Sequence, residues 1–277
     1  MLRYTLRRLI VAVPVLFGVL LVTFFLVRMI PGDPCTAQLG EKATEAICAR
    51  FNADKGLDKP IPVQFGIYIR DVLQGDLGTS IRFNRPVTQL VAERLPVTLE
   101  LGFFALLLAS AIGVPLGIIA ALRRNSAVDV ATMVGSNIGV SMPVFWLGLM
   151  LAYVFALLLK DTPFQLPPSG RLTAGVTSVP FYVVWGWEVD LKSGLGQVLQ
   201  FFANMYLFNS LITFQWAVFW DALRHLILPA TCLVLVRTPL FMRHMRASML
   251  EVINNDYTRT ARGKGLHERT VLFTHIL

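Results

Sequence analysis

Long uncharged stretches alternate with polar segments along this chain, and the first uncharged stretch begins close to the N-terminus. Residues 9–27 carry no charged side chain, and Arg3, Arg7 and Arg8 precede them. A helix of this length can cross a hydrocarbon core of about 30 Å, and a signal peptide would have a shorter apolar region of roughly 7–15 residues. We therefore predict an N-terminal span within residues 1–30, with its basic N-terminus in the cytoplasm.

The polar segment that follows, residues 31–97, balances eight Lys and Arg residues against eight Asp and Glu residues. Cytoplasmic loops carry an excess of basic residues, so this balance predicts an extracytoplasmic helical region. Apolar residues at helical spacing predict a helix over residues 63–73. Cys35 and Cys48 fall in this region, where they form either a disulfide or two free thiols.

The second uncharged run predicts a span over residues 98–122, which returns the chain to the cytoplasm at Arg123 and Arg124. Gly113 and Gly117 within it form a GxxxG pair, with Pro115 between them. Small residues at this spacing let another helix approach closely in a membrane. The alternative is that the glycines and the proline mark a kink.

A third span is predicted over residues 135–159. Asn137 and Ser141 are four residues apart and therefore share a helix face. Together with Trp146 they are candidates for lining a translocation path. Structural hydrogen bonding and packing are the alternative roles for the same side chains.

Charge decides which of two later segments is the fourth span. Residues 194–220 are uncharged and rich in aromatic residues, whereas Arg237 and Pro239 interrupt residues 225–242. If both crossed, residues 243–269, with six Lys and Arg against three Asp and Glu, would face outside. We therefore predict a span at 225–242, an extracytoplasmic loop at 160–224 with its aromatic run at the membrane interface, and a cytoplasmic segment at 243–277. Arg237 then snorkels, pairs with another helix or binds substrate.

A short basic stretch near the end of the chain follows this span. Asp256 is a good helix N-cap, Tyr257 and Ala261 lie four residues apart on one face, and Gly263 and Gly265 end the turn. A short helix of this kind suits docking into a groove of a partner protein, although a solvated basic loop beside the membrane gives the same pattern. The candidate docking residues are Asp256, Tyr257, Arg259, Thr260, Ala261, Arg262, Gly263, Lys264, Gly265 and Leu266.

Composition supports a membrane protein and excludes several other classes. The 277 residues are 55% hydrophobic and 15% charged, against roughly 25% charged in soluble domains. Basic cytoplasmic loops account for the net charge of +8, and no nucleic-acid motif accompanies it. The sequence contains no Walker A, HExxH or GxSxG motif, and its three cysteines include no CxxC pair. We therefore expect no catalytic residue, no structural metal and no cofactor.

Several stretches, in order along the whole chain, resemble the membrane subunits of bacterial ATP-binding-cassette (ABC) importers of the dipeptide, oligopeptide and nickel permease family. They are residues 28–34 (RMIPGDP), 56–60 (GLDKP), 75–78 (GDLG), 95–102 (LPVTLELG), 141–146 (SMPVFW) and 246–251 (RASMLE). The family's cytoplasmic coupling motif is Glu-Ala-Ala, three residues and then Gly. Arg259, Thr260, Ala261 and Gly265 stand at those positions, so only the second Ala and the Gly match.

The resemblance implies an all-α, polytopic membrane protein with the type I ABC importer fold. It implies a multi-pass location in the bacterial inner membrane and import of dipeptides or oligopeptides. The implied partners are a second permease subunit, two ATPase subunits that bind ATP and Mg²⁺ and dock on residues 256–266, and an extracytoplasmic solute-binding protein. Such permeases have six spans, so we expect that the last two are missing and that the chain is truncated.

Two alternatives to this function remain open at this stage. Nickel, glutathione or an oligosaccharide is the alternative cargo within the same family, because a fold does not fix its substrate. A membrane scaffold or a pore that needs no ATPase is the alternative from a different class.

Overall fold

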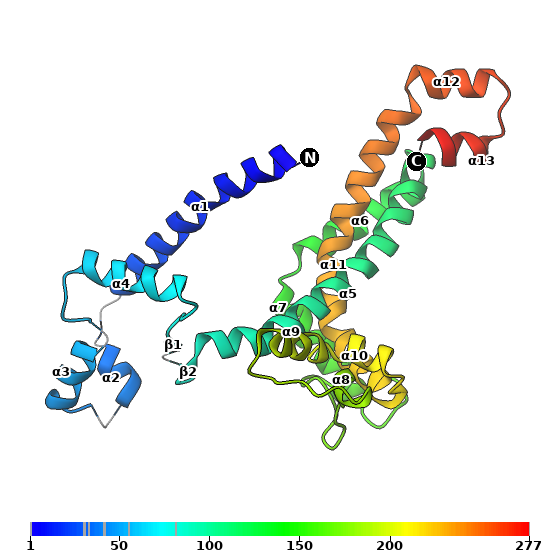
Figure 1. Ribbon diagram of the computed structural model, residues 1–277. Coiled ribbons are helices and arrows are strands. Elements are labelled where there is room, and N and C mark those ends of the chain that lie inside the picture. The colour runs from blue at the N-terminus through cyan, green and yellow to red at the C-terminus, as the bar shows by residue number, and fades with distance from the viewer. Residues whose placement is uncertain are drawn as a thin grey trace. The chain divides into compact units, whose positions relative to one another are not determined.

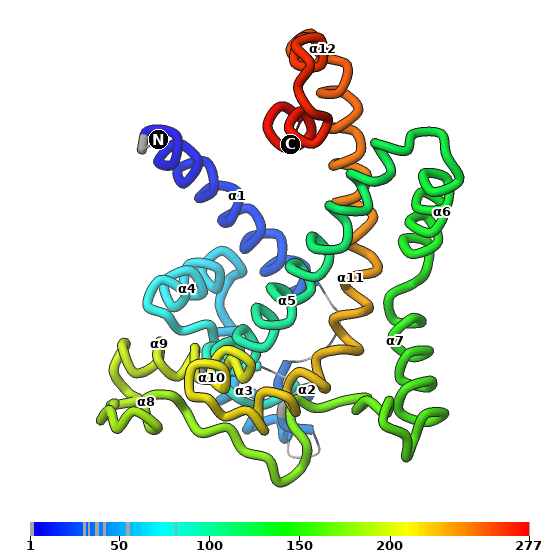
Figure 2. The backbone as a smooth tube through the Cα atoms, turned by 90° about the vertical axis from the view of Figure 1, so that its right-hand side faces the viewer, coloured from blue at the N-terminus to red at the C-terminus, as the bar shows by residue number. Residues whose placement is uncertain are grey.

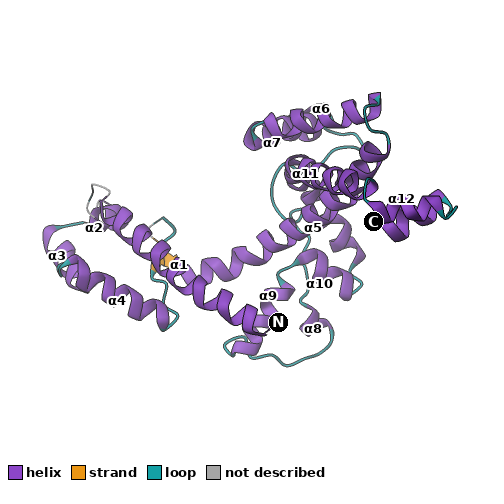
Figure 3. Cartoon of the chain, turned by 90° about the horizontal axis from the view of Figure 1, so that it is seen from above, coloured by secondary structure: helices purple, strands orange, loops and turns teal. Residues whose placement is uncertain are grey.

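The structure is a computed structural model of the chain, and it describes residues 2–29, 32, 34–40, 43–54, 56–80 and 82–276. Helices dominate these residues, and one pair of two-residue antiparallel strands accompanies them (Figure 3). The expected all-α class is therefore confirmed. Met1 and Ile30 of the predicted segment 1–30 lie outside the described residues, and so does Leu277 of the predicted segment 243–277.

The chain divides into two compact units, Met1–Ala92 and Glu93–Leu277. In the first unit, aromatic rings of one helix pack on those of another. Phe17 and Phe24 lie with ring centroids 5.7 and 5.2 Å from that of Phe65, and Arg28 Nε donates a 2.8 Å hydrogen bond to Gln64 Oε1. The elements are α1 (Leu2–Met29), α2 (Pro34–Leu39), α3 (Glu45–Asp54), α4 (Ile61–Leu73), β1 (Thr79–Ser80) and β2 (Arg85–Pro86). The helix predicted over 63–73 is confirmed as α4.

A disulfide connects α2 to α3. Cys35 and Cys48 are bonded, with their Cα atoms 5.4 Å apart, and Cys35 is fully buried. The sequence left this pair open between a disulfide and two free thiols, because a spacing along the chain does not give a distance in space.

The second unit is built on two long helices that lie side by side, α11 and the part of α5 that follows Ala92 (Figures 1 and 2). Helices α8 to α10 gather near one end of this pair, and α12 and α13 lie near the other end. The elements are α5 (Val87–Leu122), α6 (Ala127–Ser141), α7 (Val144–Ala152), the π-helical turn η2 (Tyr153–Leu158), α8 (Phe181–Val184), α9 (Gly194–Ala203), α10 (Tyr206–Ile212), α11 (Trp216–Ile253), α12 (Asp256–Gly263), α13 (Glu268–Thr270) and the π-helical turn η3 (Val271–Ile276).

By length and composition, three described helices can cross a membrane, and the bent pair α6–α7 makes a fourth candidate if it counts as one span. The three are α1, α5 and α11. The helices extend beyond the predicted spans 98–122 and 225–242, because α5 begins at Val87 and α11 extends from Trp216 to Ile253. Pro96 and Pro115 lie within α5, and Pro229 and Pro239 within α11, since neighbouring groups satisfy the backbone that a proline frees in a span.

The prediction of one span over 135–159 was wrong in its shape. This part of the chain begins its helix at Ala127 and bends by 94° between α6 and α7. Met142 is extended, with ψ of 129°, and Pro143 precedes the first residue of α7. A proline disfavours the helical conformation of the residue before it and lacks an N–H group, so the helix stops and restarts here.

The aromatic run at 194–220 does not form one long helix. Residues 194–203 and 206–212 form the short helices α9 and α10, and residues 216–220 are the first turns of α11. Phe214 has a φ of +57° in the turn that separates them. The predicted loop 160–224 therefore contains helices α8 to α10 and gives its last nine residues to α11.

A buried carboxylate on α5 holds this helical loop in place. Glu100 is 9% exposed and accepts hydrogen bonds from the backbone N–H groups of Tyr206 at 3.2 Å and Leu207 at 2.6 Å. These N–H groups begin α10, where the positive end of the peptide dipoles favours an anion. Arg171 lies 3.5 Å from the same carboxylate, and its guanidinium stacks 3.8 Å from the ring centre of Tyr206.

Helices α5 and α11 meet along a stripe of small residues. Five residues of α5 spaced four apart are buried: Ala105, Ala109, Gly113, Gly117 and Ala121. A Cβ atom at Gly113 would lie 2.8 Å from the carbonyl oxygen of Thr238, and one at Gly117 would lie 2.7 Å from that of Met242. The absence of side chains at the GxxxG pair therefore permits the close approach of the two helices.

We predict that Gly117→Ala destabilises the protein by about 1–3 kcal/mol, because the added methyl group forces the two backbones apart. Gly102→Ala is the matched control on the same helix, since no heavy atom lies within 4 Å of a Cβ placed there. Thermal unfolding of the purified variants in detergent measures the difference. Equal shifts in the midpoint for the two variants would show that close packing at Gly117 contributes nothing.

We predict that the Cys35→Ser/Cys48→Ser variant has a free energy of unfolding about 3 kcal/mol lower in the first unit, because the disulfide closes a loop of roughly 15 residues. Thiol labelling of the unfolded, unreduced protein checks the bond itself. Only Cys232, which is free and buried, should react. Labelling at three cysteines before reduction would contradict the disulfide.

Candidate functional site

The predicted docking segment folds as helix α12 and the turn after it. Asn255, rather than Asp256, occupies the N-cap position, and Asp256 is the first helical residue. The predicted cap was therefore wrong by one residue, and the hydroxyl of Thr258 holds the turn instead by donating a 2.9 Å hydrogen bond to the carbonyl of Val252. Gly265 ends the segment with a φ of +75°, a conformation that glycine adopts without a Cβ clash.

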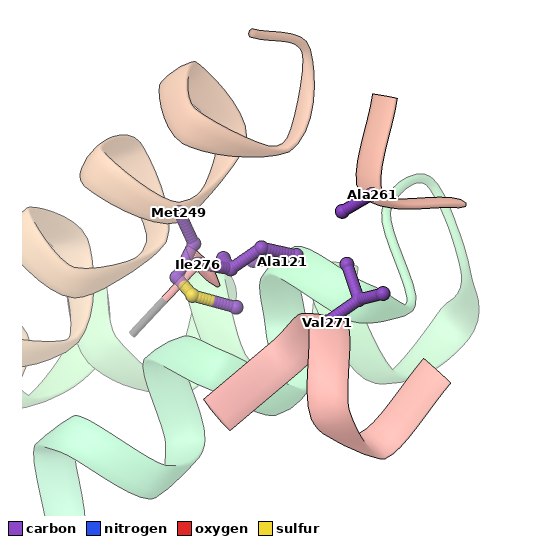
Figure 4. Packing of buried hydrophobic residues seen from close by; sticks show 5 residues of the cluster. All are labelled: Ala121, Met249, Ala261, Val271 and Ile276. Atoms are coloured by element: carbon purple, nitrogen blue, oxygen red, sulfur yellow. The ribbon is translucent and has the colours of Figure 1, made fainter. Parts of the chain in front are cut away.

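The face of α12 that contains Ala261 packs against the rest of the second unit. Ala261 is 5% exposed and belongs to a cluster that joins α12 to α5, α11 and η3 (Figure 4). The cluster consists of Ala121, Met249, Ala261, Val271 and Ile276. Tyr257, which was predicted to share the docking face of Ala261, is 50% exposed. Of the two residues predicted to share the docking face, only Tyr257 is therefore exposed, because the chain itself covers Ala261.

The outer surface of the segment is polar and basic. Arg259, Thr260, Gly263, Lys264 and Leu266 are all exposed. The hydroxyl of Thr260 bonds the carbonyl of Asp256 one turn earlier, which leaves the rest of this face open.

An ion pair connects α12 to α13. Arg262 Nη2 lies 2.6 Å from Glu268 Oε1, and its Nε also donates to Glu268. These hydrogen bonds lower the pKa of the Glu268 carboxyl, so the pair persists to a lower pH than an isolated glutamate would allow. Both side chains are exposed, and the pair therefore orients the turn more than it stabilises the fold.

The three path candidates lie in one groove at the bend between α6 and α7. Asn137, Ser141 and Trp146 all line an open, largely apolar groove of about 660 Å³. The hydroxyl of Ser141 donates a 2.8 Å hydrogen bond to the carbonyl of Asn137. The structure thus brings together the amide, the hydroxyl and the indole that the sequence singled out separately.

Arg237, the charged residue predicted inside the fourth span, is exposed on α11. It makes no hydrogen bond or ion pair with any residue that the structure describes. Interhelix pairing, one of the three roles considered for it, is therefore not seen in this part of the chain.

Sequence reasoning missed two buried charged contacts of the second unit. Asp129 on α6 forms an ion pair with Arg246 on α11, and Glu100 binds the start of α10. Each carboxylate has a feature visible in the sequence: Glu100 borders a long uncharged run, and Asp129 follows a basic turn. Their partners are more than 100 residues away, so no local pattern identifies them.

Nothing in the described part of the chain points to catalysis by a metal. No group of three or more His, Cys, Asp or Glu side chains there is arranged to hold a metal ion.

Comparison with known proteins places the chain in one family along its whole length. Residues 1–102 match the N-terminal region of binding-protein-dependent transport system membrane components, and residues 113–277 match the binding-protein-dependent transport system inner membrane component. The dipeptide transport system permease protein DppB of Alkalihalophilus pseudofirmus is 37% identical over 277 residues, which is 100% of this chain and 76% of the relative. The probable D,D-dipeptide transport system permease protein DdpB of Escherichia coli is 40% identical over 252 residues, or 91% of this chain and 67% of the relative.

These matches and the candidate spans give the same assignment. The family comprises inner-membrane, multi-pass components that are not themselves catalytic and carry no cofactor, and that work with ATPase and binding-protein partners. The chain belongs to the family of binding-protein-dependent transport system inner membrane components, and it is a permease subunit of an ABC transporter.

Proposed function

We propose that this permease subunit serves an ATP-driven importer of dipeptides and short oligopeptides. The observation that carries the proposal is the similarity, at 37% and 38% identity across the whole chain, to a dipeptide permease of Alkalihalophilus pseudofirmus and a di/tripeptide permease of Pseudomonas aeruginosa. A peptide cargo needs hydrogen-bonding groups beside apolar surface, and the groove at the α6–α7 bend offers both.

The groove supplies one wall of the translocation path. Asn137 offers a side-chain amide that donates to and accepts from a peptide backbone, and Trp146 offers an exposed aromatic surface. Ser141 adds a hydroxyl between them. Because the groove is open on one side, a second permease subunit of the same family completes the path.

Helix α12 couples the subunit to an ATPase through its exposed surface. Tyr257, Thr260 and Lys264 are exposed, whereas Thr258 and Ala261 are buried against the chain's own helices. The exposed residues therefore enter a groove of the ATPase subunit, and Gly263 and Gly265 let the turn approach it closely. Two ATPase subunits serve the two permease subunits.

When α12 is displaced, the hydrophobic cluster beneath it transmits the displacement to the membrane helices α5 and α11. Ala261 contacts the ends of α5 and α11 through Ala121 and Met249, and Val271 of η3 is completely buried beside them (Figure 4). Close-packed side chains transmit a displacement instead of absorbing it. Closure of the ATPase subunits therefore moves α5 and α11 together.

The remaining surfaces follow from the predicted topology. The N-terminus and residues 243–277 lie in the cytoplasm, beside the ATPase subunits. Residues 31–97 and 160–224 face the other side, where the solute-binding protein delivers cargo. The disulfide between Cys35 and Cys48 suits this oxidising side of the membrane.

Two substitutions on opposite faces of α12 test the docking surface. Tyr257→Ala should weaken co-purification of the ATPase subunits while leaving the thermal midpoint of the permease unchanged, because the ring is exposed. Ala261→Leu should instead destabilise the permease by about 1–3 kcal/mol, because it overfills a buried cluster. Undiminished co-purification of Tyr257→Ala would reject the docking assignment.

The cargo is tested by uptake of a labelled dipeptide into proteoliposomes that contain the complete transporter. Asn137→Leu should slow uptake by about 2- to 10-fold, the effect of losing one hydrogen bond to the cargo. Thr231→Val is the control, because it removes a hydroxyl that bonds its own helix at Ile227 outside the groove. Uptake of nickel instead of dipeptide by the wild-type complex would refute the peptide assignment.

A further inference from the structure

A forked ion pair, in which Asp129 is buried and Arg246 is half-buried, joins the first turn of α6 to α11. Arg246 Nε donates to Asp129 Oδ1 and Arg246 Nη2 donates to Asp129 Oδ2, both at 2.8 Å. Asp129 is 4% exposed, and its Oδ2 also accepts the backbone N–H of Asn125 at 3.0 Å. Two parallel hydrogen bonds between planar groups fix the orientation of the two helices as well as their distance.

On its α11 side, the pair lies at the close contact of α11 with Gly117 of α5. A Cβ atom at Gly117 of α5 would lie 3.3 Å from the backbone nitrogen of Arg246. Met249, three residues further along α11, belongs to the cluster beneath α12. The backbone of Arg246 is thus held by the α5–α11 contact, and its side chain extends from that contact to α6.

Beyond this attachment, α6 borders unfilled space before it meets α11 again at Gly139, where an added Cβ would lie 3.1 Å from the carbonyl oxygen of Leu235. A cavity of about 280 Å³ lies between α5, α6 and α11, and Gly135 and Ser136 of α6 contribute to its wall. The hydroxyl groups of Ser136 and Thr238, both lining the cavity, have no hydrogen-bond partner among the described residues. Unfilled space removes the packing contacts that would otherwise fix the middle of the helix. The ion pair therefore attaches the start of α6 to α11, and unfilled space separates this attachment from the next close contact at Gly139.

The pair also lies between the groove at the α6–α7 bend and helix α12. At about 1.5 Å per helical residue, Asn137 of the groove is roughly 12 Å further along α6 than Asp129. By the same rise, the end of α11 that leads into α12 is roughly 10 Å beyond Arg246. A rigid helix on each side connects the pair to the groove and to the docking helix.

We infer that Asp129 and Arg246 are positioning residues that transmit a displacement of α12 to α6, and so to the groove lined by Asn137 and Ser141. Separating the pair would leave the buried carboxylate of Asp129 without its cation, so α6 follows α11 when the end of α11 moves. The inference rests on the proposed coupling role of α12, and it adds the route from that helix to the path.

The experiment uses the complete transporter in proteoliposomes and measures ATP hydrolysis with and without cargo-loaded binding protein. Asp129→Asn keeps the shape of the side chain but removes its charge. It should lower the stimulation by loaded binding protein about fivefold or more, within the usual range of coupling between sites, and leave co-purification of the ATPase subunits unchanged. Arg246→Lys, which keeps the charge without the fork, should retain part of the stimulation.

Arg243→Met is the matched control on the same helix. Arg243 is exposed, and its Nε reaches the carbonyl of Pro239 in its own helix at 3.3 Å, so stimulation should stay at the wild-type level. If Asp129→Asn fails to assemble, Asp129→Leu/Arg246→Met supplies the same test, because it leaves no charge unpaired.

Two outcomes overturn the inference. Wild-type stimulation in Asp129→Asn would show that α6 does not depend on the pair, and an equal loss of basal and stimulated hydrolysis would show a purely structural role. Failure of the wild-type chain to co-purify with ATPase subunits is a separate result, which contradicts the proposed function itself.

Discussion

The contact between α5 and α11 is the constraint on which the second unit depends. Lipid tails are as apolar as leucine side chains, so apolar surface alone gives little reason for two spans to associate. The four-residue repeat of Ala105, Ala109, Gly113, Gly117 and Ala121 supplies another reason, because it brings two backbones close enough for many weak contacts. Ala121 at one end of the repeat also forms part of the cluster that seats α12.

Buried charged contacts attach the other elements to this helix pair. Glu100 attaches the start of α10 to α5, and Asp129 attaches the start of α6 to Arg246 of α11. Each carboxylate accepts several hydrogen bonds, as a buried charge requires. Buried charges add little net stability, but they have few geometries in which every group is satisfied. They therefore specify where the loop helices and α6 sit, while the small-residue stripe holds the pair that receives them.

The sequence predicted those features that a local pattern encodes. The GxxxG pair, three of the four predicted spans and the helix at α4 follow from spacing and hydropathy. Charge balance argued against a span at 194–220, and the structure has two short helices and the start of α11 there. The exact ends of the helices could not be predicted from the sequence. Helix α11, for example, extends beyond the predicted span at both ends, and apolar residues occur in both extensions. The exposed face of α12 was also not predictable, because periodicity says only which residues share a face and not which face is covered. What covers Ala261 is Val271 and Ile276, which come later in the chain and reach it only in the folded structure.

The two kinds of packing in this unit give its helices different freedom. No side chain fits between α5 and α11 at Gly113 and Gly117, so the two helices are closely packed there. Helix α6, in contrast, borders a cavity and ends at a break before Pro143, where the chain turns by 94°. The tight contacts of this unit therefore lie along α5 and α11, whereas its unfilled space and its 94° bend belong to α6 and α7. That is the part of the chain on which the groove lies.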